Sequence, residues 1–374
     1  MKIAIIGGKL QGIEAAYLAF ACGFESILID ANPTAPASAM ADRFVCGDVV
    51  RRDPAVVEAM KEADFVLPAN ENDQVLAAVC AICREEGLKL AFDMEAYRIS
   101  QSKIRSDRLI HEAGIPAPRY YPGGSAPYVI KPSGESGSAG VRYAETAQEA
   151  EDFLAACKNP ENWIVQEYLE GPSYSIEVIG SPEAGYRTYT VTQIHMDHVY
   201  DCCKVTAPCE ITDAQKAEFA RVGKQLAELV NLHGIMDVEV IDDGEAFKVL
   251  EIDARIPSQT PIAVLYSSGM NLLSEIADVT VHGAFQSVQG DQKRYCAYEH
   301  YMRQDGRVVQ EGEHMMSEAG PLIIAPNFFG SKIAISDYAG ETEDFRGIFV
   351  NWADSPEELE EIRNRMRAKL GCEV

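Results

Sequence analysis

Two short runs of alternating acidic and apolar residues constrain this 374-residue chain more than any other feature. The first run covers residues 235–241, the second covers residues 249–255, and Asp242-Asp243-Gly244 follows the first. A period of two is typical of a strand with one covered face. An Asp-Gly step is a strong signal for a tight turn between two strands. The two runs are therefore expected to form an antiparallel hairpin.

This hairpin would gather four carboxylates on one face. Asp237 and Glu239 would lie roughly opposite Asp253 and Glu251. Like charges that face each other destabilise a pair of strands, whereas a divalent cation would neutralise them. Mg²⁺ is typically held by one or two carboxylates together with nucleotide phosphates. The pattern favours a Mg²⁺–nucleotide site with Arg255 beside it over a solvated acidic edge, since the neighbouring residues are all apolar.

Composition narrows the class of protein. A hydrophobic content of 47% is enough for two or three packed domains. The net charge of −25 argues against nucleic-acid binding. No apolar run approaches the roughly 18–20 residues of a membrane span, and the first apolar run is too short for a signal peptide. Ten cysteines without zinc spacing indicate reduced thiols, so a cytoplasmic protein without membrane contact is expected.

The glycine turn at Gly7–Gly12 follows the first expected strand, and Asp30 ends the second. This pair invites a dinucleotide interpretation and, with it, an NAD-dependent oxidoreductase. The fingerprint is incomplete because Lys9 stands at its third position, and Ile13 stands where a P-loop needs lysine. A Rossmann-like domain that binds no nucleotide is the favoured interpretation.

Two lysines and a flexible loop suggest a phosphate site further along. Lys131 closes an expected strand, and residues 133–140 after it are rich in glycine and serine. The backbone N–H groups of such a loop can fold over phosphate oxygens, and a lysine at its root adds a point charge. A surface hairpin without a ligand is the alternative. Lys103 begins an expected helix, and the exposed backbone of residues 165–171 could bond to an adenine edge.

In this order the pieces resemble the ATP-grasp superfamily over about residues 100–290. The resemblance implies mixed α/β and α+β structure, namely an ATP-grasp fold behind an N-terminal Rossmann-like domain with a parallel sheet. It implies domains at 1–100, 101–290 and 291–374, the last an α+β region on the large lobe. The small lobe would cover about 120–185 and the large lobe about 186–290.

The resemblance also implies roles for individual residues. Three carboxylates would hold Mg²⁺: Glu239, Glu251 and Asp253. ATP would be bound by Lys103, Lys131, Ser133, Ser136, Gly137, Ser138, Gln166, Glu167, Tyr168 and Leu169. The chain departs from the family pattern at Asp253, where asparagine is usual, and at Tyr174, where many members carry a ribose-binding acid.

More particular strings run nearly end to end and resemble the amino-acid ligases of pyrrolysine biosynthesis. These strings are Gly7–Gly12, Asn70-Glu71-Asn72, residues 92–100, Tyr200-Asp201-Cys202, residues 234–239, residues 255–261 and residues 266–269. The resemblance implies that (3R)-3-methyl-D-ornithine is joined to the ε-amine of L-lysine through an acyl phosphate, with release of ADP and phosphate. Another ATP-grasp amino-acid ligase or a carboxylase with a different acceptor is the nearest alternative, and a non-catalytic ATP sensor is disfavoured.

Such a ligase must gather negative charge and recognise cationic amines. Arg255 and Lys131 are the expected catalytic residues because fixed positive charge stabilises the developing charge of phosphoryl transfer. Substrate-binding candidates are Glu177, Asp201, Asp237, Arg255, Ser258, Gln259 and Thr260. Glu299 and His300 are weighed as further residues of the cleft. The sequence names no general base and leaves a homodimer open.

Overall fold

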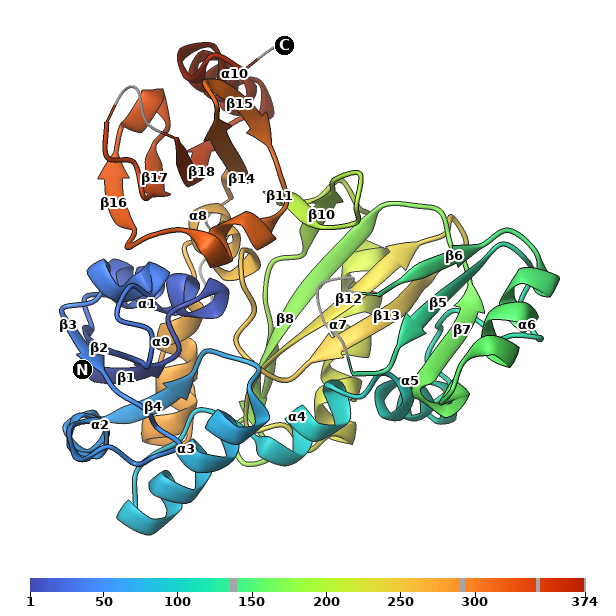
Figure 1. Cartoon of the computed structure of the whole chain (residues 1–374), viewed down its shortest axis with the longest axis horizontal. Helices are drawn as coiled ribbons and strands as arrows, with labels where there is room; N and C mark the ends of the chain where they lie inside the picture. Colours follow the sequence, from blue (N-terminus) through green and yellow to red (C-terminus); the bar gives the residue numbers. More distant parts are fainter. Residues whose placement is uncertain (135–139, 289–292, 341–343, 373–374) are drawn as a thin grey trace.

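The N-terminal domain is a four-stranded parallel sheet with helices around it (Figure 1, blue). The computed structural model describes residues 1–134, 140–288, 293–340 and 344–372. In sheet order the strands are β3 (Arg43–Cys46), β2 (Glu25–Asp30), β1 (Lys2–Ile6) and β4 (Phe65–Pro68). The helices are α1 (Leu10–Cys22), α2 (Pro54–Lys61) and α3 (Asp73–Glu86). The predicted parallel sheet is confirmed.

Two details of this domain depend on tertiary contacts. Residues 89–93 form no strand and contribute only one bridge, from Leu90 to Val66. Strand β3 is short, lies at the sheet edge and has no buried residue. Local sequence carries little signal for such an edge strand, whose formation depends on its neighbour β2.

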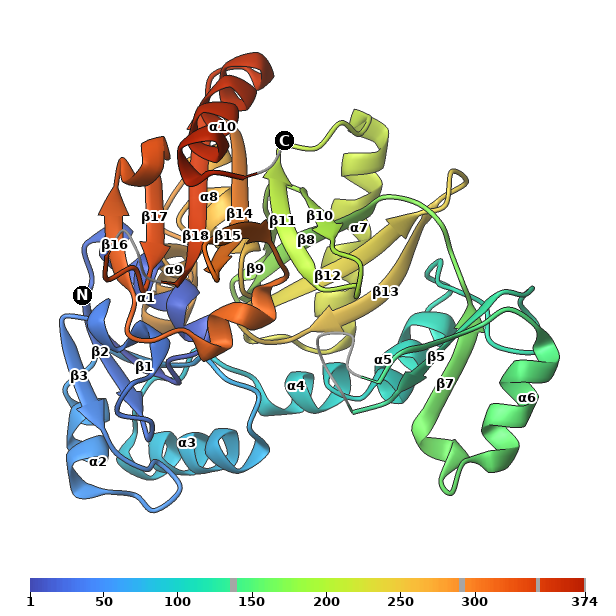
Figure 2. The same cartoon turned by 45° about the horizontal axis from the view of Figure 1, so that its top comes forward.

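The small lobe is a three-stranded antiparallel sheet at the far end of the molecule (Figures 1 and 2). Two helices lead into it, α4 (Met94–Ser100) and α5 (Lys103–Glu112). Its own elements are β5 (Tyr128–Pro132), β6 (Arg142–Ala144), α6 (Ala147–Ala156) and β7 (Trp163–Glu167). Tyr128, Ile130, Ala150 and Val165 form a core of its own. The lobe is therefore a separate packing unit on the chain.

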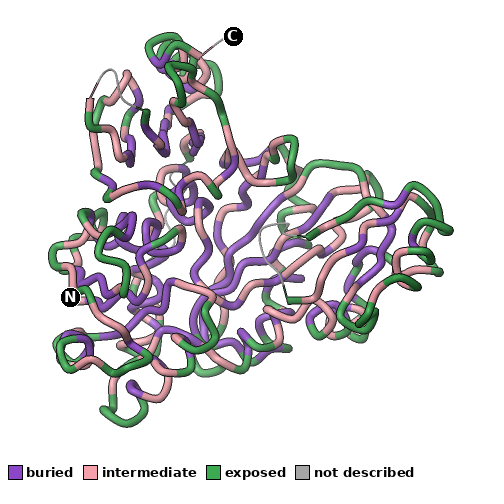
Figure 3. Tube along the Cα trace, viewed as in Figure 1, coloured by how far each residue is buried: buried purple, intermediate pink, exposed green. Residues whose placement is uncertain are grey.

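An eleven-stranded antiparallel sheet forms the centre of the molecule, and Figure 3 shows buried residues along its middle strands. The strands of its first half are β8 (Ser173–Ser181), β9 (Gly185–Thr188), β10 (Thr192–Met196), β11 (Cys202–Ala207), β12 (Gly234–Asp242) and β13 (Phe247–Asp253). Helix α7 (Asp213–Leu229) packs on this half. The small lobe was expected to reach residue 185, but β8 pairs with β12 and β10 in the large sheet. The division between the two sheets therefore lies between Glu167 and Ser173.

The acidic hairpin forms as predicted from the two alternating runs. In the β12–β13 pair, Asp237 faces Asp253 and Glu239 faces Glu251. A bulge follows Glu239, so the register shifts toward the turn. The four carboxylates share one face because directly opposed residues of an antiparallel pair point the same way.

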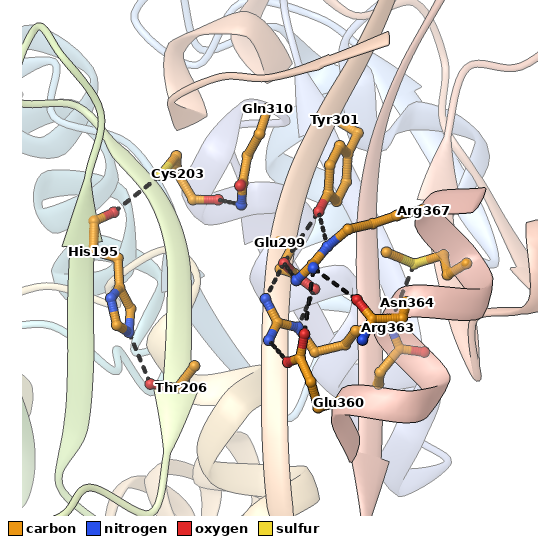
Figure 4. A network of polar contacts seen from close by, with 12 residues as sticks. His195, Cys203, Thr206, Glu299, Tyr301, Gln310, Glu360, Arg363, Asn364 and Arg367 are labelled. Carbon is orange, nitrogen blue, oxygen red and sulfur yellow. Dashed lines mark hydrogen bonds and ion pairs between the residues drawn. The ribbon is translucent and has the colours of Figure 1, made fainter. Parts of the chain in front are cut away.

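The C-terminal region continues the same large sheet instead of forming a separate one. Its strands are β14 (Tyr295–Gln304), β15 (Arg307–Gln310), β16 (Ile323–Pro326), β17 (Ile333–Ser336) and β18 (Phe345–Ala353), and α10 (Pro356–Leu370) closes the chain. Glu299 is fully buried, and its carboxylate accepts from Arg363 Nε at 2.8 Å and Nη2 at 2.7 Å (Figure 4). The interpretation of Glu299 as a cleft residue is therefore wrong, since this side chain attaches α10 to the sheet. Neither Glu299 nor His300 lines any of the cavities described below.

The N-terminal domain shares its core with the centre of the molecule. Helices α8 (Thr260–Ser268) and α9 (Leu272–Ala277) pack against α1, and one apolar cluster includes Ile5, Ile262 and Ile348. All ten cysteines are free thiols, as expected. Among the described residues, no helix is long and apolar enough to cross a membrane.

Candidate active site between the lobes

A cavity of about 640 Å³ lies between the small lobe and the large sheet. We call it the cleft cavity. Its small-lobe wall includes Lys131 and residues 166–169, and its large-sheet wall includes Glu239 and Glu251. The structure thus brings together most residues that the sequence assigned to a nucleotide. Ser136, Gly137 and Ser138 lie outside the described residues.

The two predicted lysines line the cleft cavity together with the carboxylates Glu239 and Glu251. Lys103 begins α5, where Ser102 caps the helix, and its Nζ forms an ion pair with Glu251. Burial opposes the charge of Lys103, but Glu251 outweighs it and raises the pKa of Lys103. Lys131 closes β5, and burial lowers the pKa of its ammonium. A desolvated ammonium with few compensating groups attracts an anion strongly, as a phosphate site requires.

The predicted adenine-binding segment lines the cleft cavity, but not all of its side chains face it. Gln166 donates through Nε2 to Asp107 on α5. Glu167 accepts from the backbone N–H of Arg119 at 2.9 Å and pairs with the Arg119 guanidinium at 2.8 Å. These two side chains therefore hold the strand in place. Tyr168 and Leu169 follow the strand and line the cavity.

Ser133 lies beside the first turn of α5 instead of lining the cavity. Its carbonyl accepts from Lys103 N at 3.0 Å, and its hydroxyl accepts from Ile104 N at 3.3 Å. The start of the glycine-rich loop is thereby attached to the helix that carries Lys103.

Only two of the three predicted metal carboxylates line the cleft cavity. Glu239 and Glu251 line the cleft cavity, whereas Asp253 turns toward Arg255, with Nη2 at 3.1 Å from Oδ2. Burial, with Glu251 and Asp253 adding like charge, raises the pKa of Glu239 to about 8. Among the described residues, no group of three His, Cys, Asp or Glu side chains converges closely enough to hold a metal unaided. The set fits Mg²⁺ bound with a nucleotide, because such an ion takes one or two carboxylates and completes its shell with phosphates and water.

A smaller cavity of about 130 Å³ adjoins the carboxylates, and we call it the junction cavity. Its lining residues include Asp201, Asp237, Glu239, Glu251, Asp253, Arg255, Ser258, Gln259, Thr260 and Glu313. Asp201 is held by His314, whose Nδ1 lies at 2.8 Å, and Ser258 donates to Glu313 at 2.7 Å. Gln259 adopts a φ of 71°, a strained conformation that turns the chain into α8. All substrate-binding candidates except Glu177 line this cavity.

Glu177 lies behind the junction cavity. It pairs with Asp237 across β8 and β12, and its side chain is 0% exposed. Burial raises the pKa of Glu177 to about 7, and the Thr260 hydroxyl opposes this shift. Glu177 is therefore the one substrate-binding candidate that does not line this cavity.

The glycine turn at Gly7–Gly12 borders a third cavity of about 460 Å³, which we call the N-terminal cavity. Packing explains the glycines: a Cβ on Gly12 would lie 2.2 Å from the Gly7 carbonyl oxygen. Asp30 accepts from the backbone N–H of Gly8 and of Asn32, each at 2.7 Å. Its carboxylate stabilises the turn.

Two site residues, Glu313 and Glu71, received no role from the sequence. Glu313 lines the junction and N-terminal cavities, and Glu71 pairs with Arg255 at 2.9 Å and accepts from Gln11 at 2.9 Å. Glu71 follows strand β4, and ligands of parallel sheets gather at that edge, so a signal was present there. Nothing in the acidic segment around Glu313 distinguishes it.

Comparison with known proteins agrees with this geometry. Residues 100–259 match the model of the ATP-grasp domain. The chain is 38% identical to the 3-methyl-D-ornithine–L-lysine ligase of Methanosarcina acetivorans over 84% of each chain. It is 36% identical to that of Methanosarcina mazei, over 97% of this chain and 94% of the relative.

A solved structure shows the same fold. The biotin carboxylase domain of the 2-oxoglutarate carboxylase of Hydrogenobacter thermophilus, a dimer with MgADP, ADP and bicarbonate, superposes with a TM-score of 0.73. The alignment covers 99% of this chain and 89% of that one at 16% identity. The resemblance to the ATP-grasp superfamily is confirmed in sequence and in fold. The chain is a carbon–nitrogen ligase of this superfamily and belongs to the family of 3-methyl-D-ornithine–L-lysine ligases.

Proposed function

We propose that this chain uses ATP and Mg²⁺ to join (3R)-3-methyl-D-ornithine to the ε-amine of L-lysine. One observation carries the proposal. Glu239 and Glu251 line both the cleft cavity and the junction cavity, and Arg255 stands on the junction side. A nucleotide in the first cavity and a carboxylate in the second would meet at these residues. The names of the relatives supply the substrates.

ATP occupies the cleft cavity in this proposal. Its adenine lies near the backbone of residues 166–169, and Lys103 and Lys131 face its phosphates. Ser133, Ser136, Gly137 and Ser138 remain the predicted phosphate contacts, the last three outside the described residues. Glu239 and Glu251, with Asp253 beside them, would hold Mg²⁺, whose charge would offset that of the phosphates. The lysines add fixed positive charge where the phosphoryl group transfers.

The chemistry follows from the two substrates. The carboxylate oxygen of methylornithine takes the γ-phosphoryl group, and ADP leaves. The neutral ε-amine of lysine then attacks the acyl carbon, a C–N bond forms, the C–O bond breaks, phosphate leaves, and the nitrogen gives up one proton to the phosphate or to water. Arg255 lines the junction cavity and not the cleft cavity. It therefore orients the carboxylate and the acyl phosphate instead of binding ATP.

Acidic side chains recognise the amino groups. Asp201, Asp237 and Glu313 line the junction cavity and suit ammonium groups, while Ser258, Gln259 and Thr260 supply neutral hydrogen-bonding atoms. Glu177 supports this wall from behind, next to Asp237. Three buried acceptors of this wall, Asp237 Oδ1, Gln259 Oε1 and Thr260 Oγ1, have no hydrogen-bond partner among the described residues, and Arg255 Nη1 lies 3.7 Å from the first. Buried acceptors of this kind favour a bound donor such as an ammonium.

The deciding experiment is mass spectrometry of a reaction with ATP, Mg²⁺, L-lysine and 3-methyl-D-ornithine, with D-ornithine as a surrogate. The expected product has the summed mass of both amino acids less one water, with one ADP per bond. Fragmentation then shows whether the bond involves the ε-amine. Tight ATP binding without any product would contradict this substrate pair and direct the search to other acid–amine pairs of the superfamily. Sedimentation of the purified chain tests the homodimer that we propose by analogy with the dimeric neighbour.

A further inference from the structure

Arg255 is held by a carboxylate of the N-terminal domain that is distant from it in the sequence. Its Nε lies 2.9 Å from Glu71 Oε1, and 184 positions separate the two residues. Its other nitrogens face the large sheet, with Nη2 at 3.1 Å from Asp253 and Nη1 at 3.7 Å from Asp237. A guanidinium is a rigid planar fork, so anchoring Nε sets the direction of the other two nitrogens.

Three hydrogen-bonding contacts fix the backbone at and around Glu71. Asn70 donates through Nδ2 to the carbonyl of Ile6 at 2.9 Å, which attaches the segment to β1. Asn72 caps the first turn of α3. The Tyr97 hydroxyl donates to the Glu71 carbonyl at 3.2 Å. Both asparagines therefore have local structural roles, and the side chain between them is presented to Arg255 from a fixed frame.

A second contact orients the carboxylate of Glu71. Gln11 Nε2 donates to Glu71 Oε1 at 2.9 Å, the same oxygen that Arg255 approaches. Gln11 lies in the first turn of α1, directly after the glycine turn. A continuous polar chain thus runs from the N-terminal domain through Gln11 and Glu71 to Arg255.

The pair lies where the cavities meet. Glu71 and Arg255 both line the N-terminal cavity, and Arg255 also lines the junction cavity beside Glu239 and Glu251. An arginine in this place contacts the reacting carboxylate in the proposed function. We propose that Glu71 is a positioning residue that fixes the guanidinium plane of Arg255 for acyl-phosphate formation and aminolysis. This inference rests on the proposed function.

The test compares Glu71→Gln and Glu71→Ala with the unchanged chain in the dipeptide assay. Glu71→Gln keeps an acceptor oxygen and loses the charge. We expect kcat to fall about 10–100-fold in the alanine variant, since a 1 Å misplacement of a catalytic group costs on this order. The glutamine variant should retain more activity than the alanine variant. The KM for ATP should not change, because neither residue lines the cleft cavity.

Lys89→Met is the matched control. Lys89 Nζ donates to the carbonyl of Val281 at 2.6 Å, so it joins the N-terminal domain to the centre of the chain, and Lys89 lines none of the three cavities. Its loss should lower the melting temperature slightly and leave kcat unchanged. If Glu71→Ala behaved like this control, with lower stability and full kcat, Glu71 would be an ordinary contact between domains and the proposal would be overturned.

A double-mutant cycle with Arg255→Lys separates action through Arg255 from independent action. If Glu71 acts through Arg255, Glu71→Gln should add little to the loss already caused by Arg255→Lys. If the kcat losses of the two single variants multiplied in the double variant, Glu71 would act independently of Arg255 and the proposed positioning role would be overturned. A wild-type chain that makes no dipeptide overturns the proposed function and this inference together. Product from the wild type with unchanged kcat in Glu71→Ala overturns this inference alone.

Discussion

Lys103 at the start of α5 forms an ion pair with Glu251 on β13, and this pair joins the helix before the small lobe to the acidic hairpin. Both partners line the cleft cavity, and each contacts a different ligand in the proposed function. A phosphate would bind Lys103, and Mg²⁺ would bind Glu251. Under that proposal, the Mg²⁺–nucleotide would replace this internal ion pair with two contacts to the ligand.

Lys131→Met should weaken ATP binding. Lys131 is buried at the wall of the cleft cavity, and a charge-assisted hydrogen bond contributes about 1.5–3 kcal/mol. We expect the Kd for ATP to rise at least about tenfold, measured by titration calorimetry with Mg²⁺. Lys158→Met is the control, because Lys158 is exposed on the small lobe. Unchanged ATP affinity in Lys131→Met would remove this lysine from the nucleotide site.

Arg255→Ala should lower turnover far more than ATP affinity. Arg255 contacts Asp253, Asp237 and Glu71 and does not line the cleft cavity. Removal of a group that stabilises developing charge costs about 10²–10³-fold in kcat. Initial rates at saturating ATP and a separate ATP titration check this. Equal losses in kcat and in ATP affinity would contradict its role on the substrate carboxylate.

Glu313→Gln should weaken the binding of one amino-acid substrate and leave ATP binding unchanged. Glu313 is shared by the junction and N-terminal cavities, and burial raises the pKa of its carboxyl group. Loss of its charge should raise the KM of one amino acid about tenfold, since hydrogen bonds to charged groups contribute about 1.5–3 kcal/mol. Steady-state kinetics with each substrate varied in turn identifies which one. Glu318→Gln, at an exposed glutamate, should show neither change.

Glu14→Gln should flatten the dependence of stability on pH. Glu14 is buried in α1 and accepts from Ile262 N at 2.6 Å, and burial raises its pKa from 4.5 to about 8. The folded chain therefore binds more protons than the unfolded chain between these values, and the contribution of Glu14 to stability falls as pH rises from about 4.5 to about 8. In Glu14→Gln, this decline of stability with rising pH should be absent.

Melting temperatures at pH 5, 7 and 9 measure the effect. Glu62→Gln serves as the control. Glu62 is exposed and forms an ion pair with Arg43, and this contact lowers the pKa of Glu62. Replacing Glu62 should therefore leave the slope of stability above pH 5 unchanged. A wild-type slope retained in Glu14→Gln would show that Glu14 is not the titrating group.

Much of the fold was predictable where the signal is local. The period of two and the Asp-Gly step predicted the hairpin and the pairing of Asp237 with Asp253 and of Glu239 with Glu251. Short edge strands such as β3 escaped, because their pairing depends on a neighbour and not on their own residues. The assignment of β8 to the small lobe failed for the same reason, since a strand does not encode which sheet it joins.

By itself the sequence determined the acidic hairpin, its shared face and the family, because alternation, turn chemistry and motif order are properties of neighbouring residues. Only the tertiary structure decided which of the candidates meet. It placed Glu71 on Arg255 across 184 positions, brought Glu313 to the junction cavity and withdrew Glu177 behind Asp237. Burial and contact between distant residues arise from the packing of whole domains, so no local pattern could determine them.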